Sequence, residues 1–327
     1  MSALTLFQAL DLFILDKQAA GYSANTLRNY RNTINKLHLY FATALALADL
    51  GRAQWIGFFA WLQDEYISVP GGVAPRGEIH LSQKTICNIH TDISAFYTWA
   101  VKHGHAPTHI LRSVERPRFE KPVITPLTQE EVKRLLRACQ GEAQTEDEHD
   151  RARATAVRDR ALILTLLSTG ARVSEICAAN VGDYDVVERC IKVAGKGRGR
   201  DSKERLVYVG NRAARALDRY LSDRGANRAT DPLFCVMPEQ ERRPFSRDVL
   251  GRLLRRLGDR AHVAHVHAHR FCHTFAVNYL RNGGDVLTLQ TLLGHESLEM
   301  VRHYAHLASQ DCARVHRNAD PVDNWRL

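Results

Sequence analysis

The stretch HRFCHTFAVNYLRNGGDVLTLQTLLGHESLEMVRHY, residues 269–304, carries the pattern that decides the fold. His295 follows His273 by 22 residues, and Tyr304 follows His295 by nine. Apolar residues at helical spacing predict helices over 273–281 and 286–293. The stretch therefore predicts two short helices, followed by His295 and Tyr304.

Upstream, the chain alternates helices with a little strand. The sequence TGARVSEI, residues 169–176, and the sequence GKG, residues 195–197, are the distinctive patterns there. A capping box at 128–131 predicts the start of a helix that runs through Cys139. The other predicted elements are a buried helix at 159–168, helices at 174–179, 211–224 and 246–257, and short strands at 191–193 and 206–209. Residues 142–150 (EAQTEDEHD) are predicted to be an acidic surface loop.

The N-terminal part reads as a compact four-helix unit. Its apolar periodicity predicts helices over 6–14, 27–41, 55–66 and 82–102, with Ser23 and Ser82 as N-caps. Four prolines between His105 and Pro126 predict an extended, positively charged linker, because proline cannot continue a helix. We therefore expect two domains, residues 1–118 and 119–327, in a mainly α protein with one small antiparallel sheet.

Composition limits the class of protein. The chain has 327 residues, 45% of them hydrophobic, and a formal net charge of +9, which fits a folded protein with a polyanionic partner. Its longest apolar stretch, 161–167, is far shorter than the ~20 residues of a membrane helix. The seven cysteines are odd in number and never form a C-x-x-C pair. We expect a cytoplasmic, nucleoid-associated protein with no membrane association.

Taken in order, the patterns at 169–176, 195–197, 269–276 and 293–304 resemble the tyrosine recombinase family, also called the phage integrase family. The N-terminal patterns at 22–30 and 82–104 are similar to the core-binding helical domain of that family. The resemblance covers the whole chain and implies a two-domain, Xer-like or integrase-like member. Such a protein would cleave and exchange DNA strands at specific sites through a 3′-phosphotyrosine, without a metal or cofactor.

Cleaving a DNA phosphodiester needs a nucleophile, cationic groups at the nonbridging oxygens and a proton for the leaving 5′ oxygen. The resemblance assigns Tyr304 as the nucleophile and Lys196 as the general acid. Arg172 suits the phosphate because a guanidinium is a forked, permanently charged donor. His269 and His295 would hydrogen-bond the phosphate. Glu175, three residues after Arg172, would orient its guanidinium or a neighbouring histidine.

The expected partner is double-stranded DNA, bound by a homotetramer in the synaptic complex with accessory DNA-bending proteins. The basic side chains predicted to contact DNA are Arg28, Arg31, Lys84, Arg198 and Arg200. The histidines at 262, 265, 267, 269 and 273 also allow a metal-site interpretation. No His-Glu-x-x-His pattern or complete ligand set accompanies them, so we predict no metal.

One position departs from the family pattern. Where the second phosphate-binding arginine is expected, directly before His273, this chain has Cys272. A thiol cannot replace a forked cation, which places the catalytic activity in doubt. In a rival register His267 pairs with Arg270, which then supplies the missing charge. The alternative functions are a weakened or inactive DNA-binding member of the fold and a type IB topoisomerase.

Overall fold

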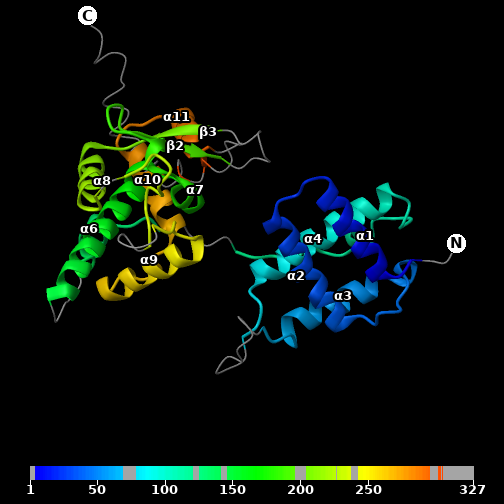
Figure 1. Ribbon diagram of the computed structural model, residues 1–327. Coiled ribbons are helices and arrows are strands. Elements are labelled where there is room, and N and C mark those ends of the chain that lie inside the picture. Colours follow the sequence, from blue (N-terminus) through cyan, green and yellow to red (C-terminus); the bar gives the residue numbers. More distant parts are fainter. Residues whose placement is uncertain are drawn as a thin grey trace, which may run out of the picture. The chain divides into compact units, whose positions relative to one another are not determined.

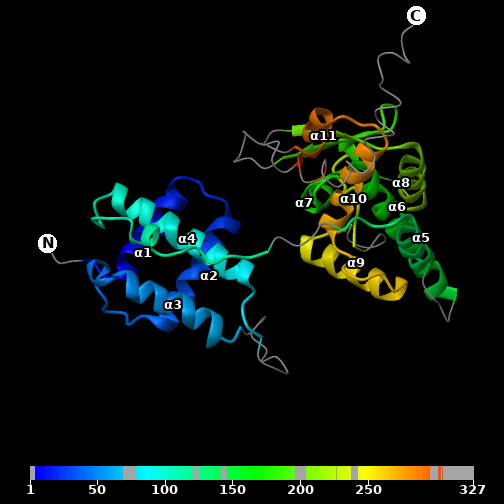
Figure 2. The same ribbon diagram turned by 180° about the vertical axis from the view of Figure 1, so that it is seen from behind.

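The computed structural model describes residues 4–68, 79–120, 125–140, 146–195, 204–225, 227–236, 242–294, 301, 302 and 304. The chain divides into two compact units, Met1–Pro122 and Val123–Leu327, which Figures 1 and 2 draw from opposite sides. Within the described ranges, the helices are all too short or too polar to cross a membrane. Each unit has its own hydrophobic core and is treated separately below.

The first unit contains the four predicted helices. They are α1 (Leu6–Ala19), α2 (Ala24–Tyr40), α3 (Arg52–Asp64) and α4 (Gln83–Lys102), with a short 3₁₀ helix η1 (Leu47–Asp49). The side chains of Ser23 and Ser82 accept hydrogen bonds from the third residue of α2 and α4, which confirms both as N-caps. Aromatic side chains fill the core, where the Trp55 indole donates to the Tyr97 hydroxyl over 3.0 Å.

The predicted linker is partly wrong. Residues Ile110–Ser113 form a 3₁₀ helix, η3, which packs on α4. Leu111 and Val114 are buried in the core of the first unit, so this part of the chain belongs to that unit. The prolines exclude an α-helix here, but they do not prevent a 3₁₀ turn that buries apolar side chains.

The second unit surrounds a small sheet with helices. Its elements are α5 (Gln129–Ala138), α6 (Glu146–Thr169), α7 (Val173–Ala178), η4 (Val181–Asp183), β1 (Tyr184–Asp185), β2 (Cys190–Ala194), β3 (Glu204–Tyr208), α8 (Asn211–Asp223), α9 (Arg247–Ala261), α10 (Ala268–Arg281) and α11 (Val286–Leu293). The strands are antiparallel in the order β1-β2-β3, with Lys192 opposite Leu206. The predicted mainly α fold with a small antiparallel sheet is confirmed.

Helix α6 provides the centre of this core. Ala161, Leu162 and Ile163 are fully buried, and α6 packs against α8 and α10 (Figure 1). The predicted capping box is also present, because the Thr128 hydroxyl accepts from the Glu131 N–H and the Glu131 carboxylate accepts from the Thr128 N–H. This core fixes the end of α6, where the candidate site begins.

Several element boundaries differ from those predicted, three of them as follows. The acidic stretch 142–150 is not a loop throughout, because α6 begins at Glu146; acidic residues favour the first turn of a helix. Helix α10 begins at Ala268, five residues earlier than predicted. Strand β3 begins at Glu204, two residues earlier than predicted, so Arg205 lies in the strand.

Candidate active site

The site begins where the buried helix α6 ends. Gly170 has a positive φ of 60°, and a Cβ there would lie 2.3 Å from the Phe275 ring on α10. A glycine is therefore needed for both the turn and the close contact between the two elements. The turn leads directly to Arg172, the N-cap residue of α7.

Arg172 is held by the short helix that it begins. Its backbone N–H donates to Glu175 Oε2 over 2.7 Å, and its guanidinium Nη1 donates to Glu175 Oε1 over 2.9 Å. Nη2 donates to the Gly294 carbonyl at the end of α11 over 2.8 Å. The side chain is 23% exposed, so it is partly accessible from solvent. Glu175 therefore contacts the guanidinium that it was predicted to orient, and the orienting role itself stays a prediction.

Arg205 reaches the same carboxylate from the sheet. Its Nη1 and Nη2 donate to Glu175 Oε1 and Oε2 over 2.6 and 2.9 Å. Burial acts to raise the pKa of Glu175, but hydrogen bonds from Arg205 and Arg172 outweigh it and hold the pKa below the ordinary value. The carboxylate is therefore ionised at neutral pH and is shared by two guanidinium groups.

Tyr304 lies against α10. Its hydroxyl is 2.8 Å from His273 Nδ1, and the hydroxyl donates to this nitrogen when Nδ1 carries no proton. Tyr304 is only 1% exposed. Burial raises its pKa well above the ordinary value, the nearby Cys272 thiol adds to this shift and Arg172 opposes it. At neutral pH the phenol is therefore protonated, and His273 is positioned to accept its proton.

Cys272 lies near both the arginines and the tyrosine. It is 8% exposed and packs in one apolar cluster with Tyr304, and its thiol is close enough to Arg172 and Glu175 for both to affect its pKa. Burial raises the pKa of this thiol to about 11, while Arg172 acts to lower it. The thiol is therefore neutral at physiological pH, so the position carries no cationic group.

The other residues of the first turn of α10 have different surroundings. His269 is exposed, and its ring centroid is 6.3 Å from that of His273. Arg270 is 8% exposed and donates to both oxygens of Glu131, over 2.9 and 3.1 Å, and to the carbonyls of Thr125 and Ala264. In this geometry Arg270 connects α10 to α5. Its guanidinium, which the rival register would place at the phosphate, is bonded to Glu131 instead.

Several predicted residues lie outside the described part of the chain. These are Lys196, Arg198, Arg200 and His295. In the first unit, Arg28 and Arg31 are exposed on α2. Lys84 is exposed on α4, with its ammonium nitrogen 4.2 Å from the Phe119 ring centroid.

The structure adds two residues to the predicted set. His273 contacts Tyr304, and Arg205 contacts Glu175. His273 could have been found from its position four residues after His269, which puts both on one helix face. Arg205 lies between the outward-facing Glu204 and Leu206, and this alternation could have indicated that its side chain points inward. The predicted strand begins at 206, so the prediction does not include the alternation at Arg205. Across the described ranges, no three His, Cys, Asp or Glu side chains group as metal ligands.

Comparisons with known proteins identify the family and the fold of the chain. Residues 126–311 match the model of the phage integrase family. The chain is 31% identical over 92% of its length to tyrosine recombinase XerC of Corynebacterium efficiens, covering 87% of that protein. It is 28% identical over 88% of its length to tyrosine recombinase XerD of Neisseria meningitidis serogroup B, covering 89% of that protein. A crystal structure of a lambda integrase dimer bound to a COC′ core site has the same fold, with a TM-score of 0.68 and 18% identity over 91% of this chain and 97% of that one.

Proposed function

Because the chain belongs to the phage integrase family and is a tyrosine-type site-specific recombinase, we propose that Tyr304 is its nucleophile and that Arg172 binds the phosphate under attack. The observation that carries this assignment is the cluster of Arg172, Glu175, Cys272, His273 and Tyr304 in one site. In sequence, Glu175 and Cys272 lie almost a hundred residues apart.

The reaction uses these groups in one displacement. The Tyr304 oxygen forms a bond to phosphorus and gives its proton to His273, while the bond from phosphorus to the 5′ oxygen breaks. The departing oxygen takes a proton from Lys196, and the 3′ end remains bound to the protein as a phosphotyrosine. A 5′ hydroxyl from another strand reverses the step, so the bond energy is kept and no ATP is needed.

Arg172 supplies the positive charge for the nonbridging oxygens, together with His269 and His295. Two of the Arg172 N–H groups are used by Glu175 and Gly294, and these bonds fix the direction of the remaining ones. Because Tyr304 is 1% exposed, its side chain must turn outward to reach a phosphate.

Cys272 lowers the expected rate without changing the reaction class. Losing one preorganised donor to the developing charge costs about 10²- to 10³-fold in rate. The chain is then a slow recombinase, with Arg172 as the principal guanidinium at the phosphate. A type IB topoisomerase, which shares the chemistry, has no observation here in its favour.

The proposed partners follow from the same chemistry. Double-stranded DNA is bound by both units, with Arg28, Arg31 and Lys84 of the first unit on its backbone. Lambda integrase, whose fold this chain shares, is seen as a dimer on a core site. We infer that this chain assembles as a tetramer at synapsis, with accessory DNA-bending proteins, in association with the nucleoid.

The test is a nicked suicide substrate, which loses a short strand after cleavage and so traps the covalent complex. We expect an adduct that blocks the 3′ end at the cleavage site and leaves a free 5′ hydroxyl. An adduct on the 5′ end, or cleavage without an adduct, would refute the proposed polarity and chemistry.

A further inference from the structure

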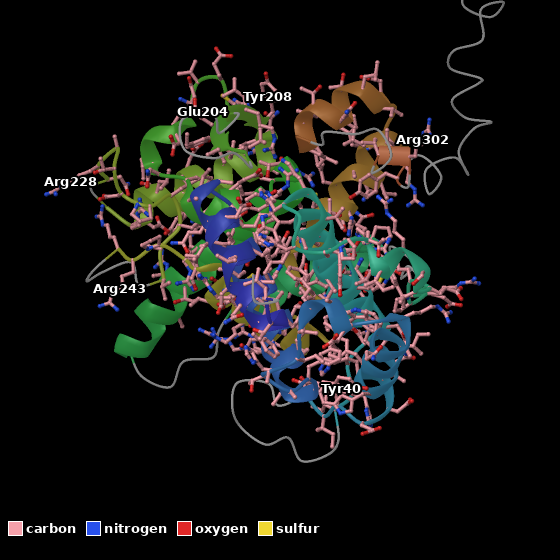
Figure 3. All side chains as sticks on the ribbon, turned by 90° about the vertical axis from the view of Figure 1, so that its right-hand side faces the viewer. Tyr40, Glu204, Tyr208, Arg228, Arg243 and Arg302 are labelled. Atoms are coloured by element: carbon pink, nitrogen blue, oxygen red, sulfur yellow. The ribbon has the colours of Figure 1, made fainter. Side chains whose placement is uncertain are left out.

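Arg205 is the residue through which strand β3 contacts the cluster around Arg172. The outer face of the strand carries Glu204 and Tyr208, which lie at the protein surface (Figure 3). Arg205 points to the other face, and its side chain is 12% exposed. Its guanidinium makes a two-pronged ion pair with Glu175 on α7. Strand and helix are therefore joined at one carboxylate.

The same guanidinium also reaches helix α11. Arg205 Nε donates to the Leu292 carbonyl over 2.9 Å, and Arg172 Nη2 donates to the Gly294 carbonyl over 2.8 Å. Carbonyls at the end of a helix have no partner within the helix, so these contacts satisfy them. Together with Glu175, the two arginines close a ring of hydrogen bonds across α7, β3 and α11.

Gly294 permits this approach. It ends α11 with a left-handed φ of 60°, and a Cβ at this position would lie 3.2 Å from three atoms of the Arg205 side chain. A larger residue would be strained in this left-handed conformation, and its Cβ would crowd the Arg205 side chain. The contact between Arg205 and the end of α11 is therefore a close-packed feature of the site.

The geometry points to Arg205 as a positioning residue, which holds strand β3, Arg172 and the end of α11 in one arrangement. Its value for catalysis rests on the proposed function. Lys196 precedes β3 in the chain and His295 directly follows Gly294, so the segments that Arg205 joins lead to two of the proposed catalytic residues. Arg205 donates from Nε, Nη1 and Nη2 within the protein, and the inference assigns it no contact with the phosphate. It acts through the residues that do.

The forked shape of the side chain matters in addition to its charge. Arg172 already places one positive charge beside Glu175, so charge neutralisation does not require Arg205. A lysine could pair with the carboxylate, but it could not bridge both carboxylate oxygens and the Leu292 carbonyl with a planar fork. Arg205→Lys therefore separates positioning from charge balance.

Arg158 provides a matched control outside the cluster. It is buried on α6, its guanidinium pairs with Asp159 over 2.7 Å, and Nη1 donates to the Val236 carbonyl over 2.6 Å. Arg158→Gln and Arg205→Gln each remove a guanidinium that bridges a carboxylate and a carbonyl. If Arg205→Gln acted only by lowering the stability of the fold, Arg158→Gln should have the same effect.

The first measurement is amide hydrogen exchange on the full chain without DNA. In Arg205→Gln we expect exchange to accelerate by about tenfold or more in three separate segments, α7, β3 and α11, because their shared contact is lost. Arg158→Gln should leave α7 and α11 unchanged. Faster exchange confined to β3 would overturn the inference, and this result does not depend on whether the chain cleaves DNA.

The second measurement compares DNA affinity with the single-turnover rate of adduct formation on a suicide substrate. We expect Arg205→Gln and Arg205→Lys to bind DNA within about threefold of the wild type, since phosphate contacts dominate affinity. Adduct formation should fall by about 10²-fold in Arg205→Gln, and Arg205→Lys should recover little of it, because small misplacements of catalytic groups are costly. Arg158→Gln should keep the wild-type rate.

Wild-type rates in Arg205→Lys would reduce the role to charge balance, and equal losses in the Arg158 and Arg205 variants would reduce it to stability; either result overturns the inference. If the wild type itself forms no adduct, the proposed function fails, and hydrogen exchange alone decides the role of Arg205.

Discussion

At the scale of single residues, neighbours in sequence have very different roles. Arg270 and Cys272 are two positions apart on α10, which rotates their side chains by about 200° around the helix. Arg270 is buried against Glu131, whereas Cys272 lies near Arg172 and Tyr304. The sequence shows the unusual cysteine but leaves open whether Cys272 or Arg270 faces the site, because the start of the helix decides this.

Cys272→Arg should raise the rate of adduct formation by about 10²-fold, because it places a second guanidinium beside Tyr304 and Arg172. The thiol that contributes to the raised pKa of Tyr304 is removed in the same step. Single-turnover cleavage of a suicide substrate measures this change. Cys139→Ser, a substitution of another buried cysteine that lies outside the cluster, serves as the control. An inert Cys272→Arg protein that is folded and binds DNA would contradict the placement of this residue.

Arg270→Ala should act on stability. Removing the guanidinium leaves the Glu131 carboxylate without its ion-pair partner, at a cost of about 3 kcal/mol in the free energy of unfolding. Urea denaturation measures the loss. Folded Arg270→Ala protein should still form the adduct at a rate near that of the wild type, and a stable but cleavage-dead variant would favour the rival register.

At the scale of elements, periodicity predicted the helices well and the ends of the strands poorly. The capping serines and the box at Thr128 are local signals, and they are confirmed. Strand β1 and the first residues of β3 depend on pairing across the sheet, which a single sequence does not encode locally. For the same reason the strand predicted at 206–209 begins two residues too late to include Arg205, and the sequence does not reveal its contact with Glu175.

The contact between α7, β3 and α11 should make stability depend on pH. Because the pKa of Glu175 is below its ordinary value of 4.5, its ionised form favours the folded state. This contribution is fully present above pH 4.5 and is lost as the pH falls through the lower, folded-state pKa. At neutral pH, Glu175→Gln should cost about 3 kcal/mol in the free energy of unfolding, since two arginines lose their shared partner.

Thermal unfolding of both proteins from pH 7 downward tests this expectation. The difference between the wild type and Glu175→Gln should shrink below pH 4.5. A difference that stays constant to pH 3 would show that the ionised carboxylate is not what stabilises the contact.

At the scale of the whole molecule, charge indicated the partner and motif order indicated the chemistry. A net charge of +9 on 327 residues favours a polyanion, and no single part of the site would have identified the family. The sequence could order Arg172, Cys272 and Tyr304 along the chain, but it could not predict that Tyr304 would be buried against His273. That contact depends on how residues distant in sequence pack together.

DNA binding should weaken steeply with salt, because phosphate contacts release counterions in proportion to their number. Arg28→Gln and Arg31→Gln should each lower the slope of log affinity against log salt by about one. Arg215→Gln is the matched control, since this exposed arginine lies on α8, on the flank of its unit opposite to α7 in both views (Figures 1 and 2). Slopes that are unchanged in the α2 variants would remove that helix from the DNA-contacting surface.

The most direct test of the account identifies the residue that is covalently bound to DNA. A trapped adduct from a suicide substrate is digested, and the modified peptide is sequenced by mass spectrometry. We expect the DNA on Tyr304, no adduct in Tyr304→Phe, and a normal adduct in Tyr184→Phe, which loses a hydroxyl that donates to Asp218 elsewhere in the same unit. DNA bound to another residue, or an adduct that persists in Tyr304→Phe, would contradict the central claim.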